Sequence, residues 1–202
     1  MSTQQEQSHD ALGRVHILTG EGKGKTTAAL GLAMRAAGGG LKVIMIQFLK
    51  RSNRYGELKA ALKLAPEFEI VQMGPECVRL LEDPSADATC TGCMKCHVDP
   101  QNLRIADLDA ARKGMDLAER ALTEDEYDLV ILDEINYAIG FNLVAPEEVQ
   151  ALLKRKRRDV EVVLTGRNAH PLLLEAADYV TEMHEVKHPW RRGEQARRGI
   201  EY

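Results

Sequence analysis

Short apolar runs alternate along the chain with longer segments whose apolar residues recur at helical spacing. The apolar runs predict six buried strands, at residues 15–18, 42–48, 68–73, 128–132, 160–164 and 179–183. The segments between them predict helices at residues 26–37, 103–122, 146–153 and 171–177. Strands that are apolar throughout and separated by helices are typical of a parallel sheet covered on both faces. The pattern therefore predicts an α/β fold with a mostly parallel sheet and helices on both faces.

Two segments lie outside this pattern. Residues 1–13 are polar without periodicity, which predicts a flexible N-terminal arm. Residues 74–102 contain all four cysteines and little periodicity, which indicates an insertion. Since the chain has 202 residues, we expect a single domain over residues 14–202 that contains this insertion.

The composition is that of an ordinary globular protein, with 44% hydrophobic and 29% charged residues. The formal net charge of −4 argues against a protein that coats nucleic acid through bulk charge. No apolar run approaches the length of about 18 residues that marks a membrane-spanning helix. The first residues also lack the basic and apolar parts of a signal peptide. We therefore expect a cytoplasmic protein without membrane or nucleic-acid partners, whose cysteines are reduced thiols or metal ligands.

The turn after the first strand has the composition of a phosphate-binding loop. Residues 19–27 read TGEGKGKTT, and glycines at alternate positions let backbone N–H groups point inward at a helix N-terminus, where anions bind. Lys25 adds a positive charge for phosphate oxygens, and the hydroxyl of Thr26 can ligate Mg²⁺. Thr19 stands where the strict P-loop pattern has its first glycine. The alternative is a glycine turn beside a chance lysine, but it does not account for the flanking strand and helix.

A second motif complements this loop. Residues 128–134, DLVILDE, form an apolar strand that ends in Asp133 and Glu134. In P-loop proteins an acid at this place holds the metal from the side opposite the loop. The sequence does not show which of the two acids holds Mg²⁺, directly or through water. Because parallel sheets bind ligands beyond the carboxyl ends of their strands, we expect the chemistry at residues 19–27, 48–57, 74–77, 133–137 and 165–170.

Seven motifs occur in a fixed order: TGEGKGKTTAALGLAMRAAG, VIMIQFLK, YDLVILDEINYAI, VVLTGRNAH, ADYVTEM, VKHPW and GIEY. Together they resemble the ATP:corrinoid adenosyltransferases of the CobA/BtuR/CobO type, from about Gly13 to Tyr202. The resemblance implies a RecA-like P-loop NTPase fold. It also implies a reaction in which the Co(I) of cobalamin or cobyrinic acid a,c-diamide attacks C5′ of ATP and releases triphosphate. Mg²⁺ or Mn²⁺, a homodimer and a reductase or flavodoxin-like electron donor are implied as well.

The resemblance also implies roles for particular residues. The loop would wrap the triphosphate with Lys25 and Thr26 at its centre, and Glu134 would be the acid beside the metal. Negative charge grows on the leaving triphosphate, and cationic side chains together with the metal can offset it. The residues assigned to the site in this way are Gly20, Glu21, Gly22, Lys23, Gly24, Lys25, Thr26, Thr27, Asp133, Glu134, Arg167, Lys187, His188 and Trp190.

A corrinoid also needs a wide apolar surface and partners for its polar side chains. The apolar candidates are Ile135, Tyr137, Phe141 and Trp190; for the first three a place in the core is the stronger expectation. Candidates for contacts with carboxylate or amide side chains of the corrinoid are Arg191, Arg192, Arg197 and Arg198.

The cysteine-containing insertion departs from the family. Many relatives carry a Phe and a Trp after the third strand that pack against the lower face of the corrinoid. This chain has GPEC at residues 74–77, and no Phe, Trp or Tyr follows that segment until Tyr127. Cys90, Cys93 and Cys96 form C-x-x-C-x-x-C, and with Cys77 they could hold Zn²⁺ or an iron–sulfur cluster; free thiols are the alternative. Residues 93–97 also match the c-type haem motif, but haem attachment normally follows export, and no export signal is visible.

Two other functions remain open at this point. A P-loop ATPase or kinase would need a residue beyond the second strand that orients water or an acceptor, and the candidates are Gln47 and Glu57. A nucleotide- and metal-responsive binding module would instead use the loop and the cysteines, and it would bind ATP without releasing triphosphate.

Overall fold

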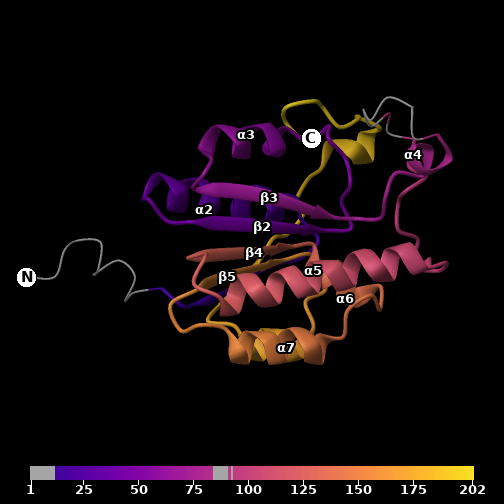
Figure 1. The fold of residues 1–202 in the computed structure, drawn as a ribbon. Helices are drawn as coiled ribbons and strands as arrows, with labels where there is room; N and C mark the ends of the chain where they lie inside the picture. Colours follow the sequence, from indigo (N-terminus) through magenta and orange to yellow (C-terminus); the bar gives the residue numbers. More distant parts are fainter. Residues whose placement is uncertain (1–11, 84–90, 92) are drawn as a thin grey trace, which may run out of the picture.

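A six-stranded parallel sheet lies between two layers of helices in the computed structural model, which describes residues 12–83, 91 and 93–202 (Figure 1). The strands run in the order β3-β2-β4-β5-β1-β6, and all five neighbouring pairs are parallel. Each lies within one residue of its predicted bounds: β1 (Val15–Thr19), β2 (Val43–Phe48), β3 (Phe68–Met73), β4 (Leu129–Asp133), β5 (Glu161–Thr165) and β6 (Tyr179–Glu182). The predicted parallel α/β sheet is therefore confirmed.

Helices cover both faces of the sheet, as expected. On one face lie α2 (Lys25–Gly38) and α3 (Gly56–Leu64). On the other lie α5 (Ile105–Thr123), α6 (Ile135–Gly140), α7 (Pro146–Arg155) and α8 (Pro171–Ala176). Two further short helices are α4 (Val78–Glu82) and the 3₁₀ helix η1 (Pro189–Arg192). Within the described residues no helix is long and apolar enough to cross a bilayer.

The sequence did not predict α3, α4, α6 or η1. Three of them bury at most one side chain each, so they leave little apolar periodicity to detect. The fourth, α6, follows β4 after Glu134 alone and is itself largely buried. Its apolar residues therefore extend the apolar run of the strand, and periodicity does not separate the two elements.

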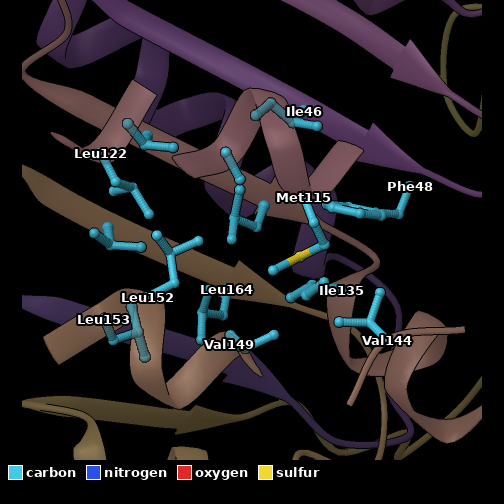
Figure 2. Packing of buried hydrophobic residues seen from close by; sticks show 14 of the residues in the cluster. Ile46, Phe48, Met115, Leu122, Ile135, Val144, Val149, Leu152, Leu153 and Leu164 are labelled. Atoms are coloured by element: carbon cyan, nitrogen blue, oxygen red, sulfur yellow. The ribbon is translucent and has the colours of Figure 1, made fainter. Parts of the chain in front are cut away.

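Alternating side chains of the strands enter two separate cores. Ile44, Ile46 and Phe48 of β2 face the layer of α5 and α7, whereas Val43 and Met45 face α2 and α3. Figure 2 shows how side chains of α5 and α7 converge with those of the sheet in the larger core. This burial on both faces is why the central strands are apolar throughout.

Of the apolar residues at helical spacing in α5, only some face the core. Met115 and Leu122 are buried, but Ile105 is 78% exposed and Leu108 is 45% exposed. Both exposed residues belong to the amino-terminal part of α5, which extends past the end of the sheet (Figure 1). The predicted arm also ends earlier than expected, because the backbone N–H of Gly13 donates to Glu161 Oε2 at 2.8 Å. The rest of that arm, residues 1–11, lies outside the described residues.

Candidate active site

The loop between β1 and α2 is held against the segment that follows β6. The backbone N–H of Gly22 donates to the carbonyl oxygen of Met183 at 2.6 Å. A Cβ atom at Gly22 would lie 2.7 Å from that same oxygen, which is closer than real contacts allow. Gly24 caps α2 with a left-handed φ of 106°, a conformation that glycine adopts without steric cost. The alternate glycines therefore serve both the curl of the loop and its close approach to a neighbouring segment.

Lys25 folds back into this loop. Its ammonium donates to the carbonyl oxygens of Gly20 and Gly22, at 2.6 Å each. Burial, and then the positive charge of Arg167, lower the pKa of Lys25 below its ordinary value. A polyphosphate would bring negative charge to this ammonium. An anion in the loop would therefore favour the protonated form of Lys25 and raise its pKa again.

The buried carboxylate of Asp133 lies at the centre of the site. Its Oδ1 accepts hydrogen bonds from the hydroxyls of Thr26 at 2.8 Å and Thr165 at 2.7 Å. Its Oδ2 accepts from the ammonium of Lys50 at 2.7 Å and the amide of Gln47 at 3.2 Å. The side chain is fully buried, so these four donors replace the water that a carboxylate would otherwise bind.

Sequence reasoning missed Lys50. Burial alone would lower the pKa of Lys50, but the attraction of Asp133 outweighs that effect and the pKa is raised. The ammonium therefore stays protonated and neutralises the buried carboxylate. One feature of the sequence could have identified Lys50: it lies two residues after β2, at the carboxyl end of a central strand, where parallel sheets bind ligands.

Glu134 has the geometry of an acid prepared for a ligand. Its backbone adopts a left-handed φ of 62°, and its N–H donates to the Thr165 hydroxyl at 2.9 Å. Its Oε2 is buried without a hydrogen-bond partner among the described residues. Burial, and then the nearby charge of Asp133, raise the pKa of Glu134 above its ordinary value. A buried carboxylate oxygen without a partner is costly, and a bound cation would remove that cost.

The oxygen atoms around this acid fit Mg²⁺. This ion prefers oxygen ligands and is usually held by one or two carboxylates together with substrate phosphates. Thr26, Asp133 and Glu134 supply such oxygens beside the loop. In the part of the chain that the structure describes, no three His, Cys, Asp or Glu side chains group closely enough to hold a metal by themselves. The fit therefore relies on phosphate oxygens as the remaining ligands.

A cavity of about 710 Å³ opens above the loop. Of the residues assigned from sequence, its lining contains Gly22, Lys23, Gly24, Lys25, Thr26, Thr27, Glu134, Arg167 and His188, together with the corrinoid candidate Tyr137. Arg167 also forms an ion pair with Glu21, at 3.1 Å. The lining does not include Gly20, Glu21, Asp133, Lys187 or Trp190. Trp190 is 60% exposed and Ile135 is fully buried, and neither of them lines this cavity or the one adjoining it.

The C-terminal residues 199–202 form part of the same wall, which the sequence did not predict. Tyr202 contacts the loop after β2: the guanidinium of Arg54 lies 5.0 Å from the centre of its ring and donates to its hydroxyl at 3.4 Å. The closing motif GIEY was part of the family resemblance, but nothing in its composition indicates where it lies in the fold.

A second cavity of about 620 Å³ adjoins the first. The two share Lys50, Tyr55, Glu201 and Tyr202 as lining residues, so these four side chains stand between them. The second cavity is lined from the cysteine-containing insertion by Met94, Cys96 and His97.

The cysteines do not form a metal centre among the described residues. Cys77 and Cys96 are half-buried and Cys93 is exposed, and no group of three or more ligand side chains includes them. Cys90 lies outside the described residues. A Zn²⁺ or iron–sulfur site at these positions therefore stays a prediction, and metal analysis with an absorbance spectrum of the purified protein tests it.

One of the two side chains that a phosphotransferase would need is engaged elsewhere. Gln47 donates to Asp133 and accepts from the amide of Gln72 at 3.1 Å, so both ends of its amide are used. Glu57 lines the first cavity and lies 3.4 Å from the Gln47 amide. Gln47 is therefore part of the support for Asp133 and does not orient water.

Comparison with known proteins agrees with this geometry. The family model for the ATP:corrinoid adenosyltransferases BtuR/CobO/CobP matches residues 11–202. A corrinoid adenosyltransferase of Escherichia coli K12 is 35% identical over 97% of this chain and 89% of its own length. The corrinoid adenosyltransferase CobA of Salmonella typhimurium is 32% identical over the same shares, and one from Pseudomonas aeruginosa is 33% identical over 97% and 87%. The phosphate loop, the buried acids and this full-length similarity together show that the chain belongs to the ATP:corrinoid adenosyltransferase family BtuR/CobO/CobP.

Proposed function

We propose that this protein transfers the 5′-deoxyadenosyl group of ATP to the Co(I) of a reduced corrinoid and releases triphosphate. The observation that carries this proposal is the pair of adjoining cavities. One contains a phosphate loop with Lys25 and Thr26, and the other shares Lys50 and Tyr202 with it. A nucleotide whose phosphates lie in the loop can therefore meet a second, large substrate across a common wall.

The reaction needs positioning more than proton transfer. The electron pair of Co(I) forms the cobalt–carbon bond at C5′ while the C5′–oxygen bond breaks, and the triphosphate leaves with that bond's electrons. No proton moves, so a general base is not required. Lys25 and Arg167 line the cavity and would neutralise charge on the leaving group. Fixing C5′ against cobalt then supplies the remaining rate enhancement.

Thr26, Asp133 and Glu134 would hold Mg²⁺ against the triphosphate. When bound, the ion supplies a positive charge that offsets the charge on the leaving oxygens. The four hydrogen bonds to Asp133 keep this carboxylate in one orientation before the nucleotide arrives. By family resemblance we extend the proposal to Mn²⁺ as a substitute ion, to a homodimer, and to a reductase or flavodoxin-like protein as electron donor.

An anaerobic assay with MgATP and chemically reduced cob(I)alamin or cob(I)yrinic acid a,c-diamide tests the proposal. We expect the absorbance of the adenosylated corrinoid to appear together with intact triphosphate. The Lys25→Ala variant should lose at least about 100-fold in kcat/KM, as expected when a group that stabilises transition-state charge is removed. ATP binding without alkylation would favour a binding module, and release of orthophosphate would favour an ATPase; either result would refute the proposal.

A further inference from the structure

The second cavity is cationic in a way that the proposed reaction alone does not require. Lys50, Arg51 and Arg54 line it, and among its described lining residues Glu201 has the one acidic side chain. The charge of Glu201 is already used, because Arg197 donates to its two oxygens at 2.9 and 3.2 Å. Lys50 is likewise paired with Asp133. In the part of the chain that the structure describes, neither Arg51 nor Arg54 forms an ion pair with a carboxylate.

The loop that carries these two arginines is anchored on both sides of Arg51. The carbonyl of Lys50 accepts from Gly74 N–H at 2.9 Å, and the N–H of Ser52 donates to Gln72 Oε1 at 2.9 Å. Arg54 rests on the ring of Tyr202, a contact that holds a guanidinium without neutralising it. The loop therefore presents two uncompensated positive charges from a fixed backbone.

Three of the four arginines that the sequence suggested for this role are occupied. Arg191 pairs with Glu185 at 2.5 Å, Arg192 with Glu194 at 2.6 Å, and Arg197 with Glu201. None of these three, nor Arg198, lines either cavity. The expectation that these tail arginines meet the corrinoid is therefore not supported by their positions, and the unpaired cations lie instead on the loop after β2.

We propose that Arg51 and Arg54 select a corrinoid whose peripheral side chains end in free carboxylates over one in which they are amidated. This selectivity rests on the proposed adenosyltransferase function. A guanidinium forms charge-assisted, often bidentate hydrogen bonds with a carboxylate, and these are about twice as strong as bonds between neutral groups. A primary amide carries no charge, so it gains none of that attraction. The preferred substrate is thus cobyrinic acid a,c-diamide, whose remaining side chains are acids, over cobalamin.

Equilibrium binding without ATP tests the selectivity apart from catalysis. The dissociation constants of the two Co(II) corrinoids would be measured for the wild type, Arg51→Gln, Arg54→Gln and the double variant. Arg35→Gln serves as the matched control, because Arg35 is exposed near the end of α2 and lines neither cavity. Circular dichroism and melting temperature establish that each variant folds.

We expect the wild type to bind the carboxylate-rich corrinoid more tightly, and each arginine variant to lose roughly two- to fivefold of that preference, the range for an exposed charge pair. Cobalamin affinity and the Arg35→Gln control should change little, and added salt should reduce the preference of the wild type. Equal affinities in the wild type, or an unchanged preference in the double variant, would overturn the selectivity. Adenosylation is scored separately: normal turnover with equal affinities refutes only the selectivity, whereas absence of turnover on both corrinoids refutes the proposed function.

Discussion

At the scale of single residues, the carboxylate of Asp133 is buried and held by hydrogen bonds on both oxygens. Four donors from three segments of the chain surround it, and one of them is the ammonium of Lys50. A buried ion pair of this kind contributes little net stability, but removing one partner leaves the other charge uncompensated. The pair therefore serves mainly to fix the acid and the loop after β2 in one arrangement.

Replacing Lys50 by Met should lower the free energy of unfolding by about 3 kcal/mol, because Asp133 then remains as a buried charge without a cation. Urea denaturation measures this change. Lys59→Met, an exposed lysine on α3, is the control and should change stability by less than about 0.5 kcal/mol. If the two variants are equally stable, the ion pair between Lys50 and Asp133 does not form in solution.

At the scale of elements, the position of β6 controls the phosphate loop. The segment after β6 accepts the Gly22 N–H and leaves no space for a side chain there. The loop is thus shaped from the outside as well as by its own glycines. This contact supports the curl of a loop that departs from the strict P-loop pattern at Thr19.

Gly22→Ala should therefore weaken both the fold and nucleotide binding. The added Cβ would meet backbone atoms of Met183 and His184, which cannot move aside as a flexible side chain does. We expect a loss of about 1–3 kcal/mol in stability and a clear rise in the ATP dissociation constant by calorimetry. Gly38→Ala is the control: its Cβ would meet nothing within 4 Å, and the change should stabilise by up to about 1 kcal/mol. Equal ATP affinity in both variants would contradict the argument.

The amino terminus of α5 secures the insertion beside the second cavity. Arg104 donates three hydrogen bonds to the buried carboxylate of Asp107, from its backbone N–H, Nε and Nη2, and two more to the carbonyls of Lys95 and His97. Burial would raise the pKa of Asp107, but the hydrogen bonds from Arg104 outweigh it and lower the pKa. The ionised form of Asp107 therefore stabilises the fold.

Asp107→Asn should cost about 2 kcal/mol of stability at pH 7, because it removes charge-assisted bonds to a buried group. A carboxyl whose pKa is lower in the folded than in the unfolded state stabilises the fold. This stabilisation is complete above the unfolded-state pKa of about 4, and it is lost as the pH falls through the lower folded-state pKa. The stability difference between wild type and variant should thus shrink below about pH 4. Urea midpoints measured from pH 7 to pH 3 test this, and a constant difference would argue against the pair.

At the scale of the whole molecule, the strand order brings distant segments to one edge of the sheet. The carboxyl ends of β1, β2, β4 and β5 all point toward the same cavity, and the C-terminal residues close its wall. Ligand binding should therefore stabilise the whole domain and not one element alone, since the two cores meet across the same strands.

MgATP at about 100 times its dissociation constant should stabilise the fold by about 2.7 kcal/mol. For a domain of this size that corresponds to a rise in melting temperature of about 5–10 °C. The Lys25→Ala variant should show little of this rise, and ATP with a chelator should show less than MgATP. A rise of the same size in Lys25→Ala would mean that ATP binds outside the phosphate loop.

The sequence by itself determined the parallel sheet, the glycine-rich loop and the two acids at the carboxyl end of β4. Each is a local pattern: a continuous apolar run, alternate glycines, or an acid that follows a buried strand. Helices α3 and α6 were not predicted, because one buries little and the other continues the apolar run of a strand. The aromatic candidates were also uncertain, since a local pattern does not distinguish a core residue such as Ile135 from one that lines a cavity, such as Tyr137.

Only the tertiary structure decided which cations surround the site. Lys50 reaches Asp133 across 83 positions of sequence, and Tyr202 contacts Arg54 across 148. These contacts depend on the strand order and on the path of the C-terminal segment, neither of which leaves a periodic trace along the chain. Arg51, Arg54 and the four tail arginines look alike in sequence. The fold places Arg51 and Arg54 in the lining of the second cavity, whereas it pairs Arg191, Arg192 and Arg197 with carboxylates.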